Sequence, residues 1–414
     1  MSDMRARVDA ALARGHGMLR LAPSWVPRSF MIPGGRLKLD PAHLYALGAA
    51  RGGINERWLA STTGADNGPG TSENEGLSSV VLDGSDGERL VLLRDAIAEA
   101  GDLILGNSVM DAQGGWNVLN KFFDDMGPIP HHVHQMDEHA ANVGKIGKPE
   151  AYFFPRQMNL KPNDFPYTFF GLRPETTKAD VRRCLEAWEA GDNGILYHSQ
   201  AYALCPGTGW RVAPGILHAP GSLVTYEPQK PCDIFGMFQS MVEGRYVPWD
   251  LLVKDVPPEK HRDLDYIISM LDWEANVDPR FSEHNFVKPL PRHSMEASGD
   301  IGYFDSWVVY GTPDYSAIEL TVLPGRTVSI SDTAAYGLIV LQGHGSMNDQ
   351  PVSSPSTIRY GEFTEDEYFA SHSAAVEGII IENPGIEPLV MLKHFGPGTP
   401  GAPILELGGV GHGR

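Results

Sequence analysis

From about Gly53 onward the sequence consists of short apolar runs separated by Gly, Asp, Asn and Pro, and this texture most constrains the fold. Such runs are typical of antiparallel β-strands joined by turns. The 46 glycines and 32 prolines among 414 residues favour the same interpretation, because neither residue suits the interior of a long helix. We therefore expect a mainly β fold built from two jelly-roll β-barrels.

Helical patterns divide this β texture into parts. The stretch SDMRARVDAALARG has apolar positions at helical spacing, and one further helix is expected at TTKADVRRCLEAWEAGDNG, inside the first β-rich part. A charged stretch that is poor in glycine suits a helical connector between the two β-rich parts. The sequence thus predicts a helical and irregular segment (1–50), a first β domain with a helical insert (51–245), a connector (246–284) and a second β domain (285–414).

Charge and cysteine content limit the partners and the location. The formal net charge of −19 argues against nucleic acid or an anionic membrane as a partner. No run reaches the roughly 18 apolar residues of a membrane span, and the N-terminus lacks the apolar core of a signal peptide. Three widely spaced cysteines (Cys184, Cys205 and Cys232) indicate reduced thiols rather than a disulfide framework. We expect a cytoplasmic protein and leave homo-oligomerisation open.

Four histidines and two glutamates lie in PHHVHQMDEHAANVGKIGKPEAYFFP, residues 130–155. Two of the histidines, His132 and His134, would share one face of a strand, whereas His131 would face away. Farther along, His218 follows a Pro-Gly turn in VAPGILHAPGSLVTYEPQ. Imidazole nitrogens and a carboxylate oxygen suit zinc, manganese, iron, nickel or cobalt, with a position left open for water or substrate. The pattern predicts one bound divalent metal ion.

The carboxylate ligand has two candidates. A His-x-His pair also occurs on solvated strands, and the later Pro-Gly-x-x-His motif is what favours a metal site here. Together the two motifs are similar to those of cupin barrels. The ordinary cupin spacing, with Glu three or four residues after the pair, selects Glu138 as the ligand.

A broader resemblance selects Glu150 instead. Residues 50–245 resemble the core of the type I mannose-6-phosphate isomerases, which carry a Gln-x-His pair, a Lys-Pro-Glu motif and a Pro-x-Gly-x-x-His-Ala motif. The segment ERWLASTT is similar to the Glu-x-Trp-x-x-Ser segment of that family. This resemblance implies zinc as the metal and places Glu138 and His139 beside the site. The ligands that it implies are His132, His134, Glu150 and His218.

The same resemblance implies aldose–ketose isomerisation of a small-molecule sugar. A metal would stabilise negative charge beside the sugar carbonyl while a base moves a proton between adjacent carbons. Lys148 occupies the position of the family's motif lysine, and it should face the same side as Glu150. Burial near a metal would lower the pKa of Lys148, so we predict a catalytic amine there. The alternative is that Lys148 only holds the substrate.

The sequence also departs from the family pattern. His132 stands where the family has glutamine, Pro130 replaces a serine that helps to hold phosphate, and Met237 replaces an arginine on the strand after the last histidine. Of the residues with which the family binds the phosphate group, Lys121 is kept. Arg156 is a further candidate for substrate binding. Because two contacts to phosphate are lost, we expect a non-phosphorylated sugar or a similar polyol carbonyl compound.

Two other functions would use the same ligands. A dioxygenase-type cupin would need a redox-active metal such as iron. A non-catalytic sugar-binding cupin would keep the pocket without an acid or base such as Lys148. In the second β domain the position of the histidine pair reads Asp332, Thr333, Ala334, so we expect that half to be structural.

Overall fold

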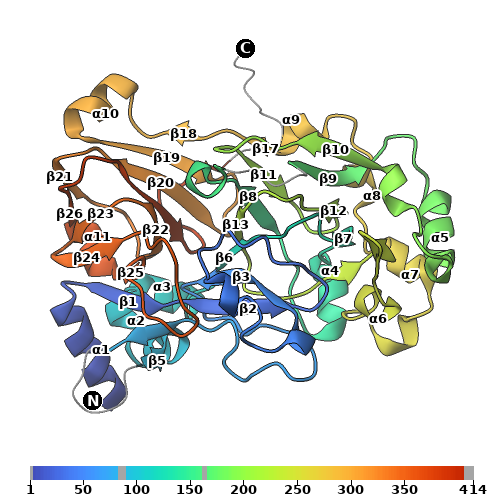
Figure 1. Cartoon of the computed structure of the whole chain (residues 1–414), viewed down its shortest axis with the longest axis horizontal. Helices are drawn as coiled ribbons and strands as arrows, with labels where there is room; N and C mark the ends of the chain where they lie inside the picture. Colours follow the sequence, from blue (N-terminus) through green and yellow to red (C-terminus); the bar gives the residue numbers. More distant parts are fainter. Residues whose placement is uncertain (1–2, 83–89, 161–165, 405–414) are drawn as a thin grey trace.

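The computed structural model describes residues 3–82, 90–160 and 166–404, and within them the strands form four large sheets and a small hairpin (Figure 1). The expected mainly β fold is confirmed. The sheets stack in the order five-stranded, seven-stranded, nine-stranded and four-stranded, as the apolar clusters between them show. We call the five- and seven-stranded sheets the first sandwich and the nine- and four-stranded sheets the second sandwich.

The seven-stranded sheet of the first sandwich has the order β17-β11-β8-β13-β6-β3-β2, and the five-stranded sheet has the order β10-β9-β12-β7-β14. The seven strands are β2 (Ser24–Arg28), β3 (Gly53–Leu59), β6 (Leu119–Phe123), β8 (Glu150–Phe153), β11 (Gly209–Val212), β13 (Thr225–Gln229) and β17 (Phe286–Val287). The five strands are β7 (His132–Val133), β9 (Tyr167–Leu172), β10 (Ser199–Ala203), β12 (His218–Ala219) and β14 (Gly236–Met237). Strands β15 (Met241–Val242) and β16 (Arg245–Tyr246) form the hairpin.

Aromatic side chains join the two sheets of the first sandwich. Phe123 and Tyr152 project from the seven-stranded sheet, with their ring centroids 5.8 Å apart. Tyr152 lies 6.0 Å from the ring of Phe170, which belongs to the five-stranded sheet. These buried rings belong to one apolar cluster, so the space between the two sheets is a packed interior.

The nine-stranded sheet of the second sandwich has the order β18-β19-β20-β27-β22-β25-β1-β4-β5, and the four-stranded sheet has the order β21-β26-β23-β24. The nine strands are β1 (Met18–Ala22), β4 (Ser79–Val81), β5 (Leu90–Leu92), β18 (Leu290–Pro291), β19 (Tyr303–Val309), β20 (Ser316–Val322), β22 (Tyr336–Gln342), β25 (Glu367–Ala370) and β27 (Leu389–Phe395). The four strands are β21 (Arg326–Ile330), β23 (His344–Met347), β24 (Gln350–Ser353) and β26 (Ile379–Asn383).

Strand β27, with the sequence LVMLKHF, is buried along its whole length because both of its faces are covered. Leu389 and Met391 pack into the core of the second sandwich. Leu392 faces the other way and shares a cluster with Phe122 and Tyr226 of the first sandwich. This alternation explains why the strand reads as a nearly continuous apolar run instead of alternating apolar and polar residues.

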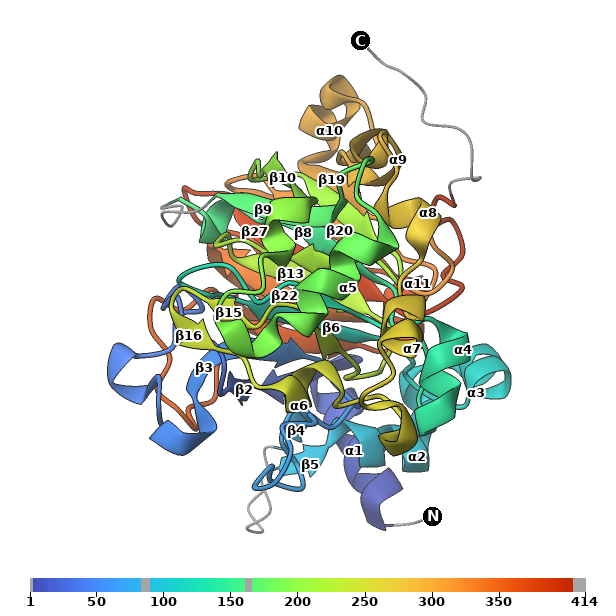
Figure 2. The same cartoon turned by 90° about the vertical axis from the view of Figure 1, so that its right-hand side faces the viewer.

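Helices lie at the ends and edges of the stacked sheets (Figures 1 and 2). The expected insert is confirmed as α5 (Lys178–Glu186), which Thr177 and Asp180 begin with reciprocal side-chain to backbone hydrogen bonds. The expected connector contains α6 (Trp249–Leu252), α7 (Leu264–Ser269), α8 (Trp273–Asn276) and α9 (Phe281–Asn285). The other α-helices are α1 (Asp3–Arg14), α2 (Leu93–Ile104), α3 (Asn107–Gln113), α4 (Asp137–Ala140), α10 (Met295–Ile301) and α11 (His372–Glu377).

Two sequence predictions were wrong. The first β-rich part contains α2 and α3 as well as the expected insert, and α2 buries Leu93, Ile97 and Ile104 at helical spacing. The segment 1–50 is not only helical and irregular, because it also contains strands β1 and β2. Strand β1 pairs with β25 of the distant C-terminal region, a contact that a local pattern cannot reveal. None of the helices in the described residues is both long and apolar enough to cross a bilayer.

Candidate metal centre

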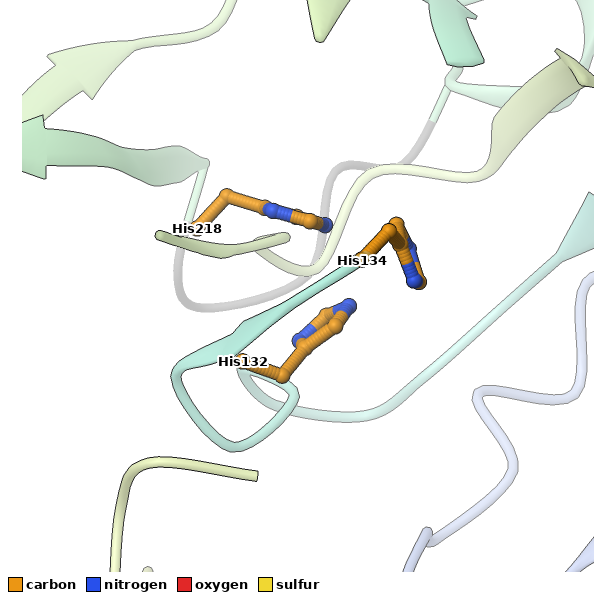
Figure 3. Close-up of side chains that lie close together, drawn as sticks. All are labelled: His132, His134 and His218. Atoms are coloured by element: carbon orange, nitrogen blue, oxygen red, sulfur yellow. The ribbon is translucent and has the colours of Figure 1, made fainter. Parts of the chain in front are cut away.

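Three histidines converge between the sheets of the first sandwich (Figure 3). His132 on β7 and His218 on β12 are directly paired across neighbouring strands of the five-stranded sheet, and their ring centroids are 4.0 Å apart. His134 follows β7, with its ring 5.1 Å from His132 and 5.0 Å from His218. One nitrogen from each ring lies within 4.8 Å of the others, and all three residues are buried.

Backbone carbonyls fix the orientation of all three rings. Nδ1 of His132 lies 2.8 Å from the carbonyl oxygen of Pro130, and Nδ1 of His134 lies 2.6 Å from that of Ile234. Nδ1 of His218 lies 2.9 Å from the carbonyl oxygen of Ile216. A carbonyl can only accept a hydrogen bond, so each Nδ1 carries the proton and each Nε2 keeps its lone pair. Lone pairs held in this way are suited to a metal ion.

Glu150 reaches the three histidines from β8, in the sheet opposite. Its Oε2 lies 3.0 Å from Nε2 of His134, and its Oε1 lies 3.2 Å from Nε2 of His218. The side chain is fully buried. Among the described residues, Nε2 of His218 has no hydrogen-bond partner. Buried polar atoms without a partner are costly, and a cation among them would remove that cost.

The protonation states of these groups also fit a metal ion. Burial lowers the pKa of His134 to about 4 and holds the pKa of His132 well below its usual value. Burial opposes ionisation of Glu150, but the charges of Lys148 and His134 outweigh it and hold the Glu150 pKa well below its usual range. These shifts favour neutral imidazoles at His132 and His134 beside an ionised Glu150, and these are the forms that bind divalent metals.

The other glutamate and the other two histidines of residues 130–155 lie away from the three clustered rings. Glu138 is on α4, its side chain is 73% exposed, and its Oε1 lies 3.5 Å from Nδ1 of His139. Nε2 of His139 lies 3.1 Å from Oγ of Ser269, at the edge of the connector. His131 is buried, and its Nε2 lies 3.2 Å from Oγ of Ser199, on the side of β7 away from the other rings.

Lys148 lies beside Glu150, as strand parity predicts. Its Nζ is 2.9 Å from Oε2 of Glu150, 3.0 Å from Nε2 of His134 and 3.3 Å from Oε1 of Glu227. The expected fall in its pKa is wrong. Burial alone would lower the Lys148 pKa, but the two carboxylates outweigh burial and raise it. The two carboxylates thus favour the protonated form of Lys148.

A cavity opens beside the histidines. Fifteen residues line it, from strands that are far apart in the sequence: Arg28, Phe30, Glu56, Lys121, Phe123, Ile129, His132, His134, Lys148, Tyr152, Pro220, Glu227, Asp233, Phe235 and Met237. Sequence reasoning assigned no role to Arg28, Glu56, Glu227 or Asp233. The only signals were the segments ERWLASTT and TYEPQKPCD, which carry three of these residues.

Each cation that lines the cavity is paired with a carboxylate. Arg28 lies 2.9 Å from Glu56 and 3.1 Å from Asp233. Lys121 lies 3.2 Å from Glu227 and 3.8 Å from Glu56. With Lys148 paired in the same way, the charges form a nearly neutral buried network rather than a cationic pocket.

Of the two residues expected to bind substrate, the structure brings only Lys121 to the cavity. Arg156 begins the short helix η4 (Arg156–Met158), where Pro155 directs the chain out of β8. Its side chain is exposed and its guanidinium lies against Gly207, so it does not reach the lining. Met237, which pairs with His132 across β14 and β7, is part of the cavity wall.

No protein-family model and no curated protein matches the sequence. Solved structures do match the fold. A mutant of phosphomannose isomerase from Salmonella typhimurium is 14% identical, with a TM-score of 0.61 and coverage of 92% of this chain and 100% of that chain. The mannose 6-phosphate isomerase from Bacillus subtilis is 13% identical, with a TM-score of 0.58 and coverage of 92% and 99%.

A zinc-bound mannose 6-phosphate isomerase is 14% identical and has a TM-score of 0.58, over 92% of this chain and 100% of that chain. At such low identity the similarity carries the fold and not the activity. The chain has the fold of the mannose 6-phosphate isomerases.

Proposed function

We propose that this protein is a metal-dependent aldose–ketose isomerase that acts on a non-phosphorylated sugar. The metal would be a single divalent ion, with zinc expected, held by His132, His134, Glu150 and His218. The observation that carries the proposal is the set of three clustered rings whose Nδ1 atoms are held by carbonyls, with the buried Glu150 carboxylate beside Nε2 of His134 and of His218. A cavity with acidic and basic groups adjoins this set.

When bound, the metal ion would act as a Lewis acid toward the substrate carbonyl. The chain itself must move the proton. Glu227 lines the cavity, and burial together with the charge of Glu150 raises its pKa, which makes its carboxylate a stronger proton acceptor. Lys148, held as a cation between Glu150 and Glu227, is placed to donate a hydrogen bond to a substrate oxygen on which charge develops.

The lining supports a substrate without a phosphate group. The three cations in it, Arg28, Lys121 and Lys148, are already engaged by carboxylates. A phosphate dianion would have to compete with these carboxylates inside a buried network, where like charges repel strongly. Next to His132 the wall is apolar, with Met237, Ile129 and Pro220. A neutral sugar can instead accept and donate hydrogen bonds without separating these ion pairs.

The test has two parts. Metal analysis of protein purified without chelator should find about one divalent ion per chain, and iron in place of zinc would favour a dioxygenase. Ketose formation is then measured from free aldoses and from their 6-phosphates as kcat/KM. We expect the protein to convert a free aldose, with a higher kcat/KM than for the phosphate ester of the same aldose. Metal binding without turnover of any aldose would favour a sugar-binding protein.

A further inference from the structure

Tyr152 makes a hydrogen bond to the proposed carboxylate ligand. It lies two residues after Glu150 on β8, so both side chains project from the same face of the strand. The Tyr152 hydroxyl donates to Oε1 of Glu150 over 2.6 Å. Its ring is only 2% exposed, and it is held between Phe123 and Phe170 of the same cluster. The hydroxyl therefore has little freedom to point elsewhere.

This bond makes the two oxygens of Glu150 unequal. Oε1 accepts the Tyr152 proton and lies 3.2 Å from Nε2 of His218. Oε2 lies 3.0 Å from Nε2 of His134 and 2.9 Å from Nζ of Lys148, with which it forms an ion pair. One oxygen is thus held by the neutral Tyr152 hydroxyl, whereas the other faces a ring nitrogen and the Lys148 cation.

We propose that Tyr152 is a positioning residue that holds the Glu150 carboxylate in the orientation that binds metal through a single oxygen. This proposal rests on the proposed ligand set. A hydrogen bond to a ligand carboxylate restricts its rotation and withdraws one lone pair, which disfavours binding through both oxygens. Tyr152 also lines the cavity.

The experiment compares wild type with Tyr152→Phe, which keeps the ring and removes only the hydroxyl. Metal-free protein is titrated with cobalt(II), and the dissociation constant and the visible absorption spectrum are recorded. Removal of such a partner weakens metal binding by about 10–100-fold, and a changed cobalt spectrum should accompany it. Tyr226→Phe is the matched control, because Tyr226 is equally buried on the neighbouring strand β13 and its hydroxyl contacts Asn120 instead.

Glu150→Gln and the double variant with Tyr152→Phe complete the test. If Tyr152 acts through Glu150, Tyr152→Phe should weaken cobalt binding less in the Glu150→Gln background than in wild type. If Tyr152→Phe instead disturbs packing, it should weaken cobalt binding equally in both backgrounds. An unchanged affinity and spectrum in Tyr152→Phe would overturn the role of Tyr152 and leave the metal site intact. If wild type binds neither cobalt nor zinc, the proposed function itself fails, and this is measured first.

Discussion

The interiors of the two sandwiches hold their buried polar groups in different ways. In the first, three buried imidazoles converge on the Glu150 carboxylate, next to a cavity. In the second, Nζ of Lys393 on β27 lies 2.6 Å from Oδ2 of Asp332, and the two side chains are 1% and 3% exposed. Lys393 also lies over the ring of Tyr336, 5.2 Å from its centroid.

The ion pairs of the second sandwich continue toward its edge. Arg292 lies 2.8 Å from Asp305, and Nδ1 of His293 lies 2.8 Å from the other oxygen of Asp305. Charges here are satisfied by one another. The comparison teaches that similar layered sheets can use buried polar groups either to complete a stable interior or to leave lone pairs for a ligand.

The largest effect is expected from Glu150→Gln, which would remove the anionic ligand from the first sandwich. Loss of an outer partner alone weakens metal binding by about 10–100-fold, so loss of the carboxylate itself should abolish metal retention and turnover. Metal content after dialysis measures this. Glu138→Gln is the control, and it should retain metal because Glu138 is 73% exposed. The opposite result would assign the ligand to Glu138.

Lys148→Gln tests the proposed donor in the same interior. We expect kcat to fall by about 10²–10⁴-fold, because a positioned acid or base contributes that much to a proton transfer. Stability should fall too, since Glu150 and Glu227 both lose a cation. The measurements are kcat and metal content. Near-normal turnover in protein that retains its metal would contradict a catalytic role for Lys148.

In the second sandwich, Lys393→Met should act on folding alone. It leaves the buried Asp332 with only Arg292, 3.7 Å away, so the free energy of unfolding should fall by up to about 3–5 kcal/mol. Denaturant unfolding measures this, and metal affinity should not change. The double variant Lys393→Met with Asp332→Leu should recover part of the loss, because no charge is then left unpaired. Loss of metal in the folded single variant would break the contrast between the two sandwiches.

His394, next to Lys393 on β27, faces the first sandwich and should change stability only below about pH 6.5, so its effect near neutral pH is the smallest. It is fully buried, neither ring nitrogen has a partner among the described residues, and burial lowers its pKa to about 3. The unfolded chain takes up this proton near pH 6.5, so stability should fall as pH falls from about 6.5 toward about 3, by roughly 1.4 kcal/mol per pH unit. His394→Leu should make unfolding less pH-dependent over that window. Equal slopes for both proteins would show that His394 does not titrate in this way.

Much of the candidate site could be predicted from the sequence because strand parity is local. A spacing of two residues places His132 with His134, and Lys148 with Glu150, on shared faces. The structure brings all four together with His218. The direction of the Lys148 pKa shift was predicted wrongly, because burial was weighed without the charges of Glu150 and Glu227. Glu227 could not have been found from the sequence, because it lies 79 residues from Lys148 and reaches it only across the sheet.

The missed features depend on long-range contacts or on competing local signals. Arg28 and Asp233 line one cavity although 205 residues separate them. Arg156 was wrongly expected to bind substrate, because the chain leaves β8 at Pro155 and the short helix η4 that follows holds Arg156 at the surface. Helix α2 follows directly from the short strand β5, so its apolar spacing was read as another β run.

Strand β1 also has a consequence for synthesis on the ribosome. Met18 pairs with Ala370, so its partner strand is made about 350 residues later. At roughly 5–20 residues per second, β1 waits on the order of 20–70 s before that edge can form. Its other neighbour, β4, is available much sooner, with Leu21 opposite Val80. Until the end of translation, pairing with β4 therefore covers only one edge of this apolar strand, and its other edge stays open to wrong partners.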